Sequence, residues 1–418
     1  MSATTEHPIR VLNLRWLYDP IRMYDRAMTE PLHGNSSYAA YMRSAAIDLV
    51  RRNGPRTRRE LADALGLSRT GIASLVDHLR DSGLAIEEDA PPVAGRPGRP
   101  PRIITLVQNE ASSVLSLIVR PRRIEAVLVS SERTVTALRT EDTPLSADAL
   151  ESTATLVGFV TELMSETGVA PSAATLVLPT PVHTGGRINP RGARELMPTW
   201  LDARVIEQMR DELSLPVHVI NETAASAVGE ATSVGLMNER CVLYVKVGAS
   251  GTAMCTLVDG NPFGGATGIA GQLGHISIRG HGVRCPCGQR GCIAAEIDYQ
   301  VKEELERRRL HNPRITVEDL VRDASDEDPA TRRFFYDIGI QLAPALGAAI
   351  NVLEPSTVIV GGDLSDVDTG LLAGLESELS LSVHPGIAEG LSILRAPVGP
   401  IATAVGSAIL LDQLAAGQ

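Results

Sequence analysis

Apolar runs of strand length alternate with helical stretches from about residue 111 to the end of the chain. The candidate strands, rich in Val, Ile and Leu, cover residues 114–119, 124–129, 176–178, 217–220, 242–247, 253–258 and 358–360. Because helical stretches separate most of these runs, the pattern predicts an α/β architecture. The length of this part of the chain indicates two lobes rather than a single core.

The first hundred residues follow helical spacing instead. One helix is predicted over residues 38–52, a second begins at Thr57, which can form a capping box with Glu60, and a third begins at Ser68 after a turn at Gly66. The third helix would bury the face made of Ile72, Leu75, Val76 and Leu79. Two short helices joined by a turn that contains Gly are typical of a helix-turn-helix, although any helical hairpin gives this pattern.

If this unit binds DNA, its third helix would enter the major groove with the N-terminus first. The small and polar side chains of its first turns would then face the bases. The candidate DNA contacts on the second and third helices are Arg58, Ser68, Arg69, Thr70, Ala73 and Ser74.

The residues after the third helix predict the wing of a winged helix. Residues 84–88 and 102–107 have strand character and flank the loop 94–101, whose sequence is AGRPGRPP. Arg96 and Arg99 on this stiff loop could enter a narrow, A·T-rich minor groove. The alternative is a Pro-rich linker between two domains.

Three parts of the chain are predicted from these patterns. Residues 1–37 form an N-terminal arm, residues 38–109 the DNA-binding domain, and residues 110–418 the body. The arm either packs on the body or on a dimer partner, or it is a disordered tail with one transient helix.

Charge is divided unevenly between these parts. The net charge is −11, yet residues 1–109 hold 15 arginines against 12 acidic residues (+3), while the remainder holds 24 basic against 38 acidic residues (−14). A basic head on an acidic body is typical of a DNA-binding module joined to a sensor domain. The run 51–59 has five arginines and no acid. By itself, a solvated helix end would explain that run.

The chain has no stretch that approaches the roughly 20 apolar residues needed to span a membrane, and its beginning lacks the apolar segment of a signal peptide. We therefore expect a cytoplasmic protein with no membrane partner. In that compartment cysteine thiols stay reduced and can bind metal.

Four candidate metal ligands lie within eighteen positions: His275, Cys285, Cys287 and Cys292. One nitrogen and three thiolates make a closed tetrahedral zinc set that leaves no position for a reacting water, so the pattern favours one structural ion over a catalytic one. The alternative is a Gly-rich loop with unrelated cysteines. The other two cysteines, Cys241 and Cys255, lie in apolar runs and are predicted to be core residues.

The segments 271–275 (GQLGH) and 285–292 (CPCGQRGC) resemble the signature of the ROK family, which comprises bacterial repressors, open reading frames and sugar kinases. The resemblance covers about residues 111–414. It implies a two-lobed actin-like (ribonuclease-H-like) body, with lobe one at about 110–235 plus the C-terminal helix and lobe two at about 236–400. It also implies that the four ligands hold one zinc. A winged helix before such a body is similar to the layout of the xylose-type and N-acetylglucosamine-type repressors.

Kinases of this family place an Asp-x-Gly-Gly-Thr turn after the first strand of the body, but here residues 118–122 read IVRPR. Arg120 and its neighbours cannot offer the same row of backbone N–H groups to phosphate, so we expect no kinase activity. The Asn-Asp pair of the family is Asn221-Glu222 in this chain. An extra methylene displaces the carboxylate by roughly 1 Å, and a shift of that size can cost about a hundredfold in rate.

Other sugar contacts of the family are also changed. Leu196, Gln272 and Ala294 stand where the resemblance implies Asn, Glu and Glu, and Glu296 or Asp298 could replace the last of these. A site that lacks several of its polar groups discriminates poorly between sugars. The candidate effector contacts are Asn221, Glu222, Gln272, His275 and Glu296.

The sequence thus favours a non-enzymatic transcription factor that represses carbohydrate-related genes in response to a sugar or a sugar derivative. It would bind a palindromic DNA operator as a homodimer, or as a tetramer of two such dimers. Two alternatives stay open: a ligand-independent regulator whose body serves only dimerisation, and an active sugar kinase with an accessory domain.

Overall fold

The computed structural model describes residues 46, 49–50, 54–81, 85–89, 101–106, 113–120, 123–142, 145, 148–182, 188, 201, 203–248, 251–278, 280–326, 328–365 and 370–416. They belong to two compact units, one before and one from Ser113. Each unit is considered by itself. The predicted arm, Arg96, Arg99 and Leu196 lie outside the described residues. The domain limits stay a prediction.

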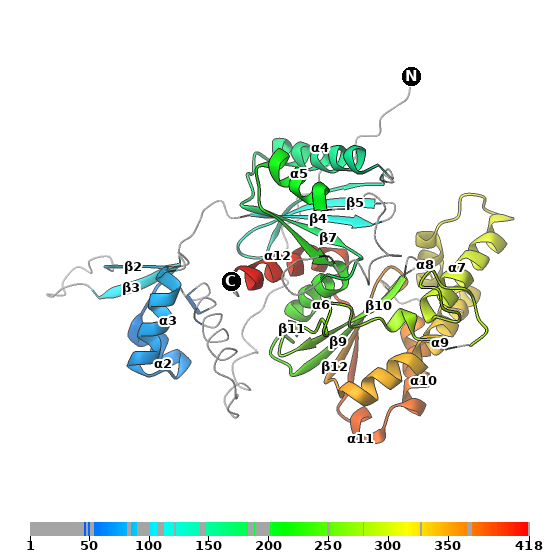
Figure 1. Cartoon of the computed structure of the whole chain (residues 1–418). Coiled ribbons are helices and arrows are strands. Elements are labelled where there is room, and N and C mark those ends of the chain that lie inside the picture. Colours follow the sequence, from blue (N-terminus) through cyan, green and yellow to red (C-terminus); the bar gives the residue numbers. More distant parts are fainter. Residues whose placement is uncertain are drawn as a thin grey trace. The chain divides into compact units, whose positions relative to one another are not determined.

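The first unit is a winged helix-turn-helix (Figure 1). Its elements are β1 (Arg56–Thr57), α2 (Arg58–Leu65), α3 (Arg69–Asp81), β2 (Ala85–Asp89) and β3 (Arg102–Leu106), and the antiparallel sheet has the order β1-β3-β2. The predicted capping box of Thr57 with Glu60 is present, and Gly66 ends α2 with a positive φ of 64°. The hydrophobic core of this unit includes Leu61, Ile72, Leu75, Val76, Leu79 and Ile104.

The second unit contains two five-stranded sheets. Sheet one has the order β6-β5-β4-β7-β8, made of β4 (Val114–Arg120), β5 (Arg123–Val129), β6 (Val135–Glu141), β7 (Ala173–Leu178) and β8 (Val217–Asn221). Helices α4 (Ala149–Thr167) and α5 (Ala203–Leu213) cover one face. Helix α12 (Pro400–Ala416) covers the other.

Sheet two has the order β11-β10-β9-β12-β13. Its strands are β9 (Cys241–Gly248), β10 (Gly251–Val258), β11 (Asn261–Pro262), β12 (Thr357–Gly361) and β13 (Ser392–Arg395). Helix α6 (Glu222–Ser233) packs on one face. The other face carries α7 (Ile293–Arg309), α8 (Val317–Ser325), α9 (Pro329–Leu353) and α10 (Leu371–Ser382), and the short α11 (Pro385–Ala388) follows.

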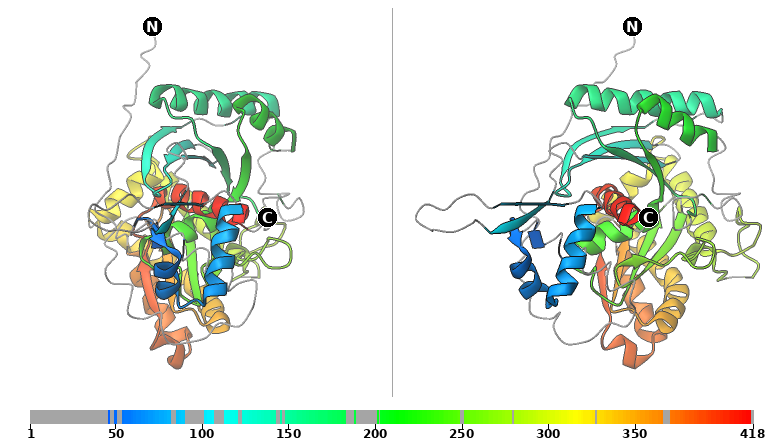
Figure 2. Two further views of the ribbon diagram at one scale, coloured as in Figure 1. Left: turned by 90° about the vertical axis from the view of Figure 1, so that its left-hand side faces the viewer. Right: turned by 60° about the vertical axis from the view of Figure 1, so that its left-hand side comes forward.

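Helices α6 and α12 lie between the two sheets (Figure 2). Their backbones approach so closely that a Cβ on Gly229 would lie 1.9 Å from the Ala402 carbonyl oxygen, and one on Gly406 would lie 1.8 Å from that of Ala225. The Glu230 carboxylate on α6 accepts the N–H groups just before α12, at 2.7 and 3.1 Å. This helix pair joins the lobes, and the predicted two-lobed actin-like architecture is confirmed.

Helix α9 is long and apolar enough to cross a membrane by length and composition alone, the one such helix among the described residues. Core residues of the lobe, among them Phe335, Ile338, Leu342 and Leu346, come from this helix and are fully buried. Packing against sheet two therefore accounts for its apolar character.

Candidate metal centre and inter-lobe charge cluster

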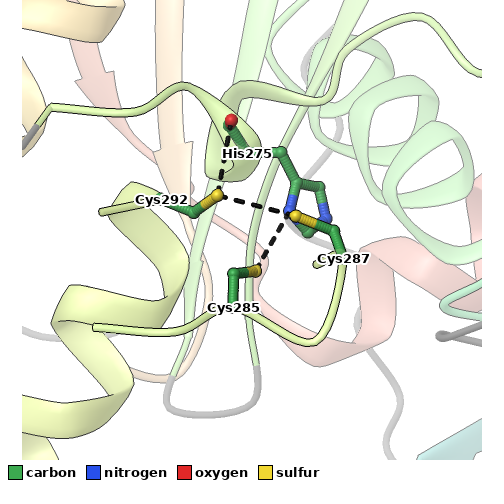
Figure 3. A group of neighbouring side chains, drawn as sticks. All are labelled: His275, Cys285, Cys287 and Cys292. Carbon is green, nitrogen blue, oxygen red and sulfur yellow. Dashed lines mark hydrogen bonds between the residues drawn. The ribbon is translucent and has the colours of Figure 1, made fainter. Parts of the chain in front are cut away.

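The four predicted metal ligands come together in the structure (Figure 3). His275 ends the short 3-10 helix η2 (Leu273–His275), and Cys292 is the residue that precedes α7. Two backbone bridges, Ser277 with Cys292 and Arg284 with Arg290, fold the loop between them back on itself. The turn also needs glycine, because φ is +90° at Gly288.

The donor atoms have the spacing of a tetrahedral site. The His275 Nδ1 atom lies 3.5 Å from Cys285 Sγ, Cys287 Sγ lies 3.6 Å from Cys292 Sγ, and all four donors lie within 4.8 Å of one another. Zn–S bonds of about 2.3 Å give an edge of about 3.8 Å between sulfurs of a tetrahedron. A disulfide needs about 2.05 Å. The cluster therefore fits a metal ion and contains no disulfide.

Burial opposes ionisation of these thiols when no cation is near. Burial, together with the neighbouring Cys287 and Cys285, raises the pKa of Cys292 to about 12. Burial also raises the pKa of Cys285. A divalent cation reverses this effect, because a thiolate bound to a metal is stable at neutral pH. Of the other two cysteines, Cys255 is buried and Cys241 half-buried, and neither belongs to this cluster.

Glu296, a predicted effector contact, supports the metal loop. Its carboxylate is buried and accepts the Val283 N–H at 2.6 Å. A Cβ on Gly282 would lie 2.0 Å from the same oxygen and 2.8 Å from the Gly291 Cα, so the loop needs glycine there. Gln272 and His275 lie at the start and the end of η2, in the same region of lobe two.

Asn221 is also bonded within the chain. Its side-chain oxygen caps α6 by accepting the Ala224 N–H at 2.9 Å, and its amide group donates to the Thr180 carbonyl oxygen at 2.9 Å. A capping role explains why Asn ends β8 at this point.

Glu222, the first residue of α6, belongs to a charge cluster with Arg120, Glu125 and Lys246. Arg120 Nε donates to one carboxylate oxygen of Glu222 at 2.7 Å, and Lys246 Nζ donates to the other at 2.7 Å. A second nitrogen of Arg120 lies 2.8 Å from the carboxylate of Glu125. The cluster holds two cations and two carboxylates, so its net charge is zero.

The two cations keep Glu222 ionised despite its burial. Burial alone would raise its pKa, but Lys246 and Arg120 lower it to about 2. Burial lowers the pKa of Arg120, and the two carboxylates more than offset this, so its pKa is raised. Sequence reasoning missed Lys246. The available signal was a lysine, one of two in the chain, in the middle of an apolar strand.

Comparison with known proteins identifies the family. The model of the ROK family matches residues 123–414. The chain belongs to the ROK family. The xylose repressor of Bacillus subtilis (strain 168) is 22% identical over 371 residues, which cover 87% of this chain and 93% of the relative. The regulator NagC of Escherichia coli (strain K12) is 23% identical over 385 residues, with 87% and 90% coverage.

Kinases of the ROK family match a smaller part of the chain. The glucokinase of Halalkalibacterium halodurans is 25% identical over 228 residues, which cover 51% of this chain and 69% of the relative.

Among solved structures, that of a ROK transcriptional regulator, a homologue of the Escherichia coli Mlc protein, has a TM-score of 0.72 and 22% identity. The match covers 91% of this chain and 98% of the regulator. A Streptomyces griseus ROK glucokinase has a TM-score of 0.62 and 19% identity, with 72% and 100% coverage.

The winged helix of this ROK protein presents most of the predicted DNA contacts. Ser68, Arg69, Thr70 and Ser74 are exposed at the start of α3, and Ala73 is half-buried. The Ser68 hydroxyl also accepts the Gly71 N–H at 3.2 Å and so caps the helix that was predicted to begin at this residue.

Arg58 differs from these residues, because its guanidinium is bonded within the unit. It donates to both carboxylate oxygens of Glu87 on β2, at 2.9 and 3.0 Å, and to Asp77 on α3 at 3.0 Å. The hydrogen bond from Arg58 lowers the pKa of Glu87. Arg58 therefore connects both helices to the wing strand.

Proposed function

We propose that this ROK protein is a transcriptional regulator that binds DNA and represses carbohydrate-related genes. One observation carries the proposal. Relatives named as repressors or regulators match 87% of the chain, whereas a ROK glucokinase structure is covered completely by 72% of it. The part that a kinase does not need includes a winged helix, which is a DNA-binding motif.

In this proposal α3 lies in the major groove, where the exposed start of the helix contacts the bases. The base contacts come from Ser68, Arg69, Thr70, Ala73 and Ser74, and Arg96 and Arg99 of the wing enter the minor groove. Arg58, which is also predicted to contact DNA, holds the wing strand and the helices together. The protein acts in the cytoplasm as a homodimer, or as a pair of dimers, on a palindromic operator.

The ion held by His275, Cys285, Cys287 and Cys292 is proposed to be a single structural Zn²⁺. A nitrogen and three thiolates are a typical closed zinc set, and the four donors leave no coordination position for substrate. The ion would fix the loop that leads into α7.

We further propose that the protein is not a kinase. A general base works best when its pKa lies near the working pH, but Glu222 has a pKa of about 2 and is bonded to two cations. Sugar sensing through Asn221, Glu222 and Glu296 gains no support from the structure, because each side chain is already bonded within the chain. A sugar-like effector stays a prediction, as do its predicted contacts Asn221, Glu222, Gln272, His275 and Glu296.

Selection from random double-stranded DNA, followed by gel-shift titration at several salt concentrations, tests DNA binding. We expect enrichment of a palindrome, and affinity that falls steeply with salt. Arg69→Ala should weaken binding about tenfold or more. The control is Arg307→Ala, which removes the same charge from an exposed arginine of α7. The proposal fails if no sequence is enriched, or if Arg69→Ala combined with Arg96→Ala binds as tightly as the unaltered protein.

An ADP-release assay over a panel of hexoses tests the enzymatic alternative. We expect no turnover above background. Turnover that Glu222→Gln abolishes would make the protein a kinase and contradict the proposal.

A further inference from the structure

The charge cluster of Arg120, Glu125, Glu222 and Lys246 links elements from both lobes. Arg120 ends β4 and Glu125 lies on β5, both in sheet one, whereas Lys246 lies on β9, the central strand of sheet two. Glu222 stands between them, one oxygen bonded to each cation. A single carboxylate thus ties sheet one to sheet two.

Strand alternation shows that these charges face the layer between the sheets. On β4, Val114 and Ile118 pack against α12, and Arg120 shares their face because side chains two apart point the same way. On β9, Val242 and Tyr244 pack against α6, and Lys246 shares that face. The cluster therefore lies in the same layer as the α6 and α12 pair that joins the lobes.

The cluster is satisfied without a ligand. Glu222 is 2% exposed, and both its oxygens accept a charged hydrogen bond. The two carboxylates balance the two cations, so no outside ion is needed to neutralise the group. Because Glu222 is buried, a sugar hydroxyl could reach its carboxylate only if the neighbouring side chains moved, and a neutral hydroxyl makes a weaker hydrogen bond than an ammonium or a guanidinium group.

We propose that the charge cluster is an internal latch, which holds the two lobes in one arrangement without a bound sugar. In this role Glu222 is a bridge between Arg120 in lobe one and Lys246 in lobe two, rather than a contact for a ligand. The lobes of this body are therefore fixed by the chain itself, and neutral sugars leave their arrangement unchanged. This inference concerns the body alone and does not rest on the proposed DNA binding.

A merely structural ion pair would behave differently from a latch. A complete buried ion pair adds little net stability over apolar packing of the same volume, because desolvation of the charges offsets their attraction, whereas removal of one partner destabilises the fold by leaving a buried charge unpaired. What a buried ion pair does fix is the relative position of the elements that carry its charges. Loss of a latch should therefore loosen the contact between α6 and α12 more than the interior of either sheet, whereas loss of general stability should affect all of these regions together.

Hydrogen–deuterium exchange of the full-length protein, followed by mass spectrometry, separates these outcomes. Lys246→Met removes the bond to sheet two and leaves the bonds of Arg120 in place. We expect amides of α6 and α12 to exchange about tenfold faster or more, with the interior strands β7 and β12 little changed. The matched control is Lys302→Met, which removes the only other lysine of the chain, an exposed residue paired with Asp298 at 2.7 Å.

Glu222→Gln provides a second variant, which keeps the size of the side chain and removes its charge. Its control is Asp142→Asn. This variant makes the same change in an exposed ion pair with Arg123, and both partners of that pair belong to lobe one. If Lys246→Met does not fold, the comparison of Glu222→Gln with Asp142→Asn tests the proposal. Unchanged exchange in α6 and α12, or a uniform increase across both sheets, would overturn the proposal.

Addition of sugars to the unaltered protein is an independent test. D-Glucose, D-xylose and N-acetyl-D-glucosamine, each at millimolar concentration, should leave exchange in α6 and α12 unchanged. Protection of these helices by any of the three sugars would mean that a ligand sets the lobe arrangement, and the latch would be wrong.

Discussion

Glu222 keeps its charge in a position where burial alone would neutralise it. Lys246 and Arg120 outweigh the desolvation of its carboxylate and lower its pKa to about 2. In the unfolded chain these cations are dispersed and the pKa returns to its ordinary value of 4.5. The difference corresponds to about 3 kcal/mol of folding free energy.

Stability should therefore depend on pH through this residue. Between about pH 4.5 and pH 2 the unfolded chain binds a proton at Glu222 and the folded chain does not, so its contribution is complete above this range and is lost as the pH falls through it. Urea unfolding of the unaltered protein and of Glu222→Gln should show the largest gap in stability at neutral pH, with a narrower gap toward about pH 3. Asp142→Asn, which changes an exposed carboxylate, should show a small gap throughout. A gap for Glu222→Gln that is the same at every pH would contradict the assigned charge state.

At the scale of elements, the close approach of α6 and α12 depends on two glycines. A Cβ at Gly229 or at Gly406 would lie within 2 Å of a backbone carbonyl oxygen of the partner helix. Backbone atoms cannot rotate away as a flexible side chain can, so the helices would have to separate. The hydrogen bond of 2.8 Å between Ser226 and Thr403 would lengthen with them.

Gly229→Ala should accordingly destabilise the body by about 3 kcal/mol, because overpacking at a backbone contact costs more than the helix propensity of Ala returns. Gly158→Ala is the matched control, since Gly158 is a helical glycine on α4 with no heavy atom within 4 Å of the added Cβ. That substitution should stabilise the protein by up to about 1 kcal/mol. Thermal unfolding measures both, and equal effects of the two substitutions would show that α6 and α12 can separate without cost.

The elements that sequence patterns predicted are those with strong local signals. Strands such as β4 and β9 are mostly apolar runs, and the caps of α2 and α3 use local hydrogen bonds. Strands β6 and β13 were missed because both lie at sheet edges, where exposed polar residues interrupt the apolar pattern.

The candidate sites also differ in whether their residues are close together in the sequence. The metal cluster was predicted because its ligands lie in one short segment. The charge cluster was not, because Arg120 and Glu222 lie 102 positions apart and only the strand order brings them together. Arg120 had been interpreted as the loss of a phosphate turn, and the structure shows what the residue does instead. Arg58 similarly meets a partner 29 positions away, which a local run of charge cannot reveal.

At the scale of the whole molecule, the body is held at two separate places. The charge cluster and the helix pair join the lobes, and the metal loop lies within lobe two, where Glu296 and Cys292 attach it to α7. The loop between η2 and α7 contributes few apolar side chains to the core, among them Cys285 and Cys292. Its fold therefore depends on the ion more than on hydrophobic packing.

Removal of the metal should consequently loosen lobe two and leave the winged helix folded. We expect one zinc per chain by elemental analysis, and a melting temperature about 5 °C lower or more after chelation or in the Cys285→Ser, Cys287→Ser double variant. Cys241→Ser, which changes a cysteine outside the cluster, should keep the metal. If the body positions two winged helices on a palindrome, affinity for DNA should fall on chelation and return when zinc is restored. Protein that contains no metal, or a double variant as stable as the unaltered chain, would mean that hydrogen bonds such as that of Glu296 to Val283 hold the loop by themselves.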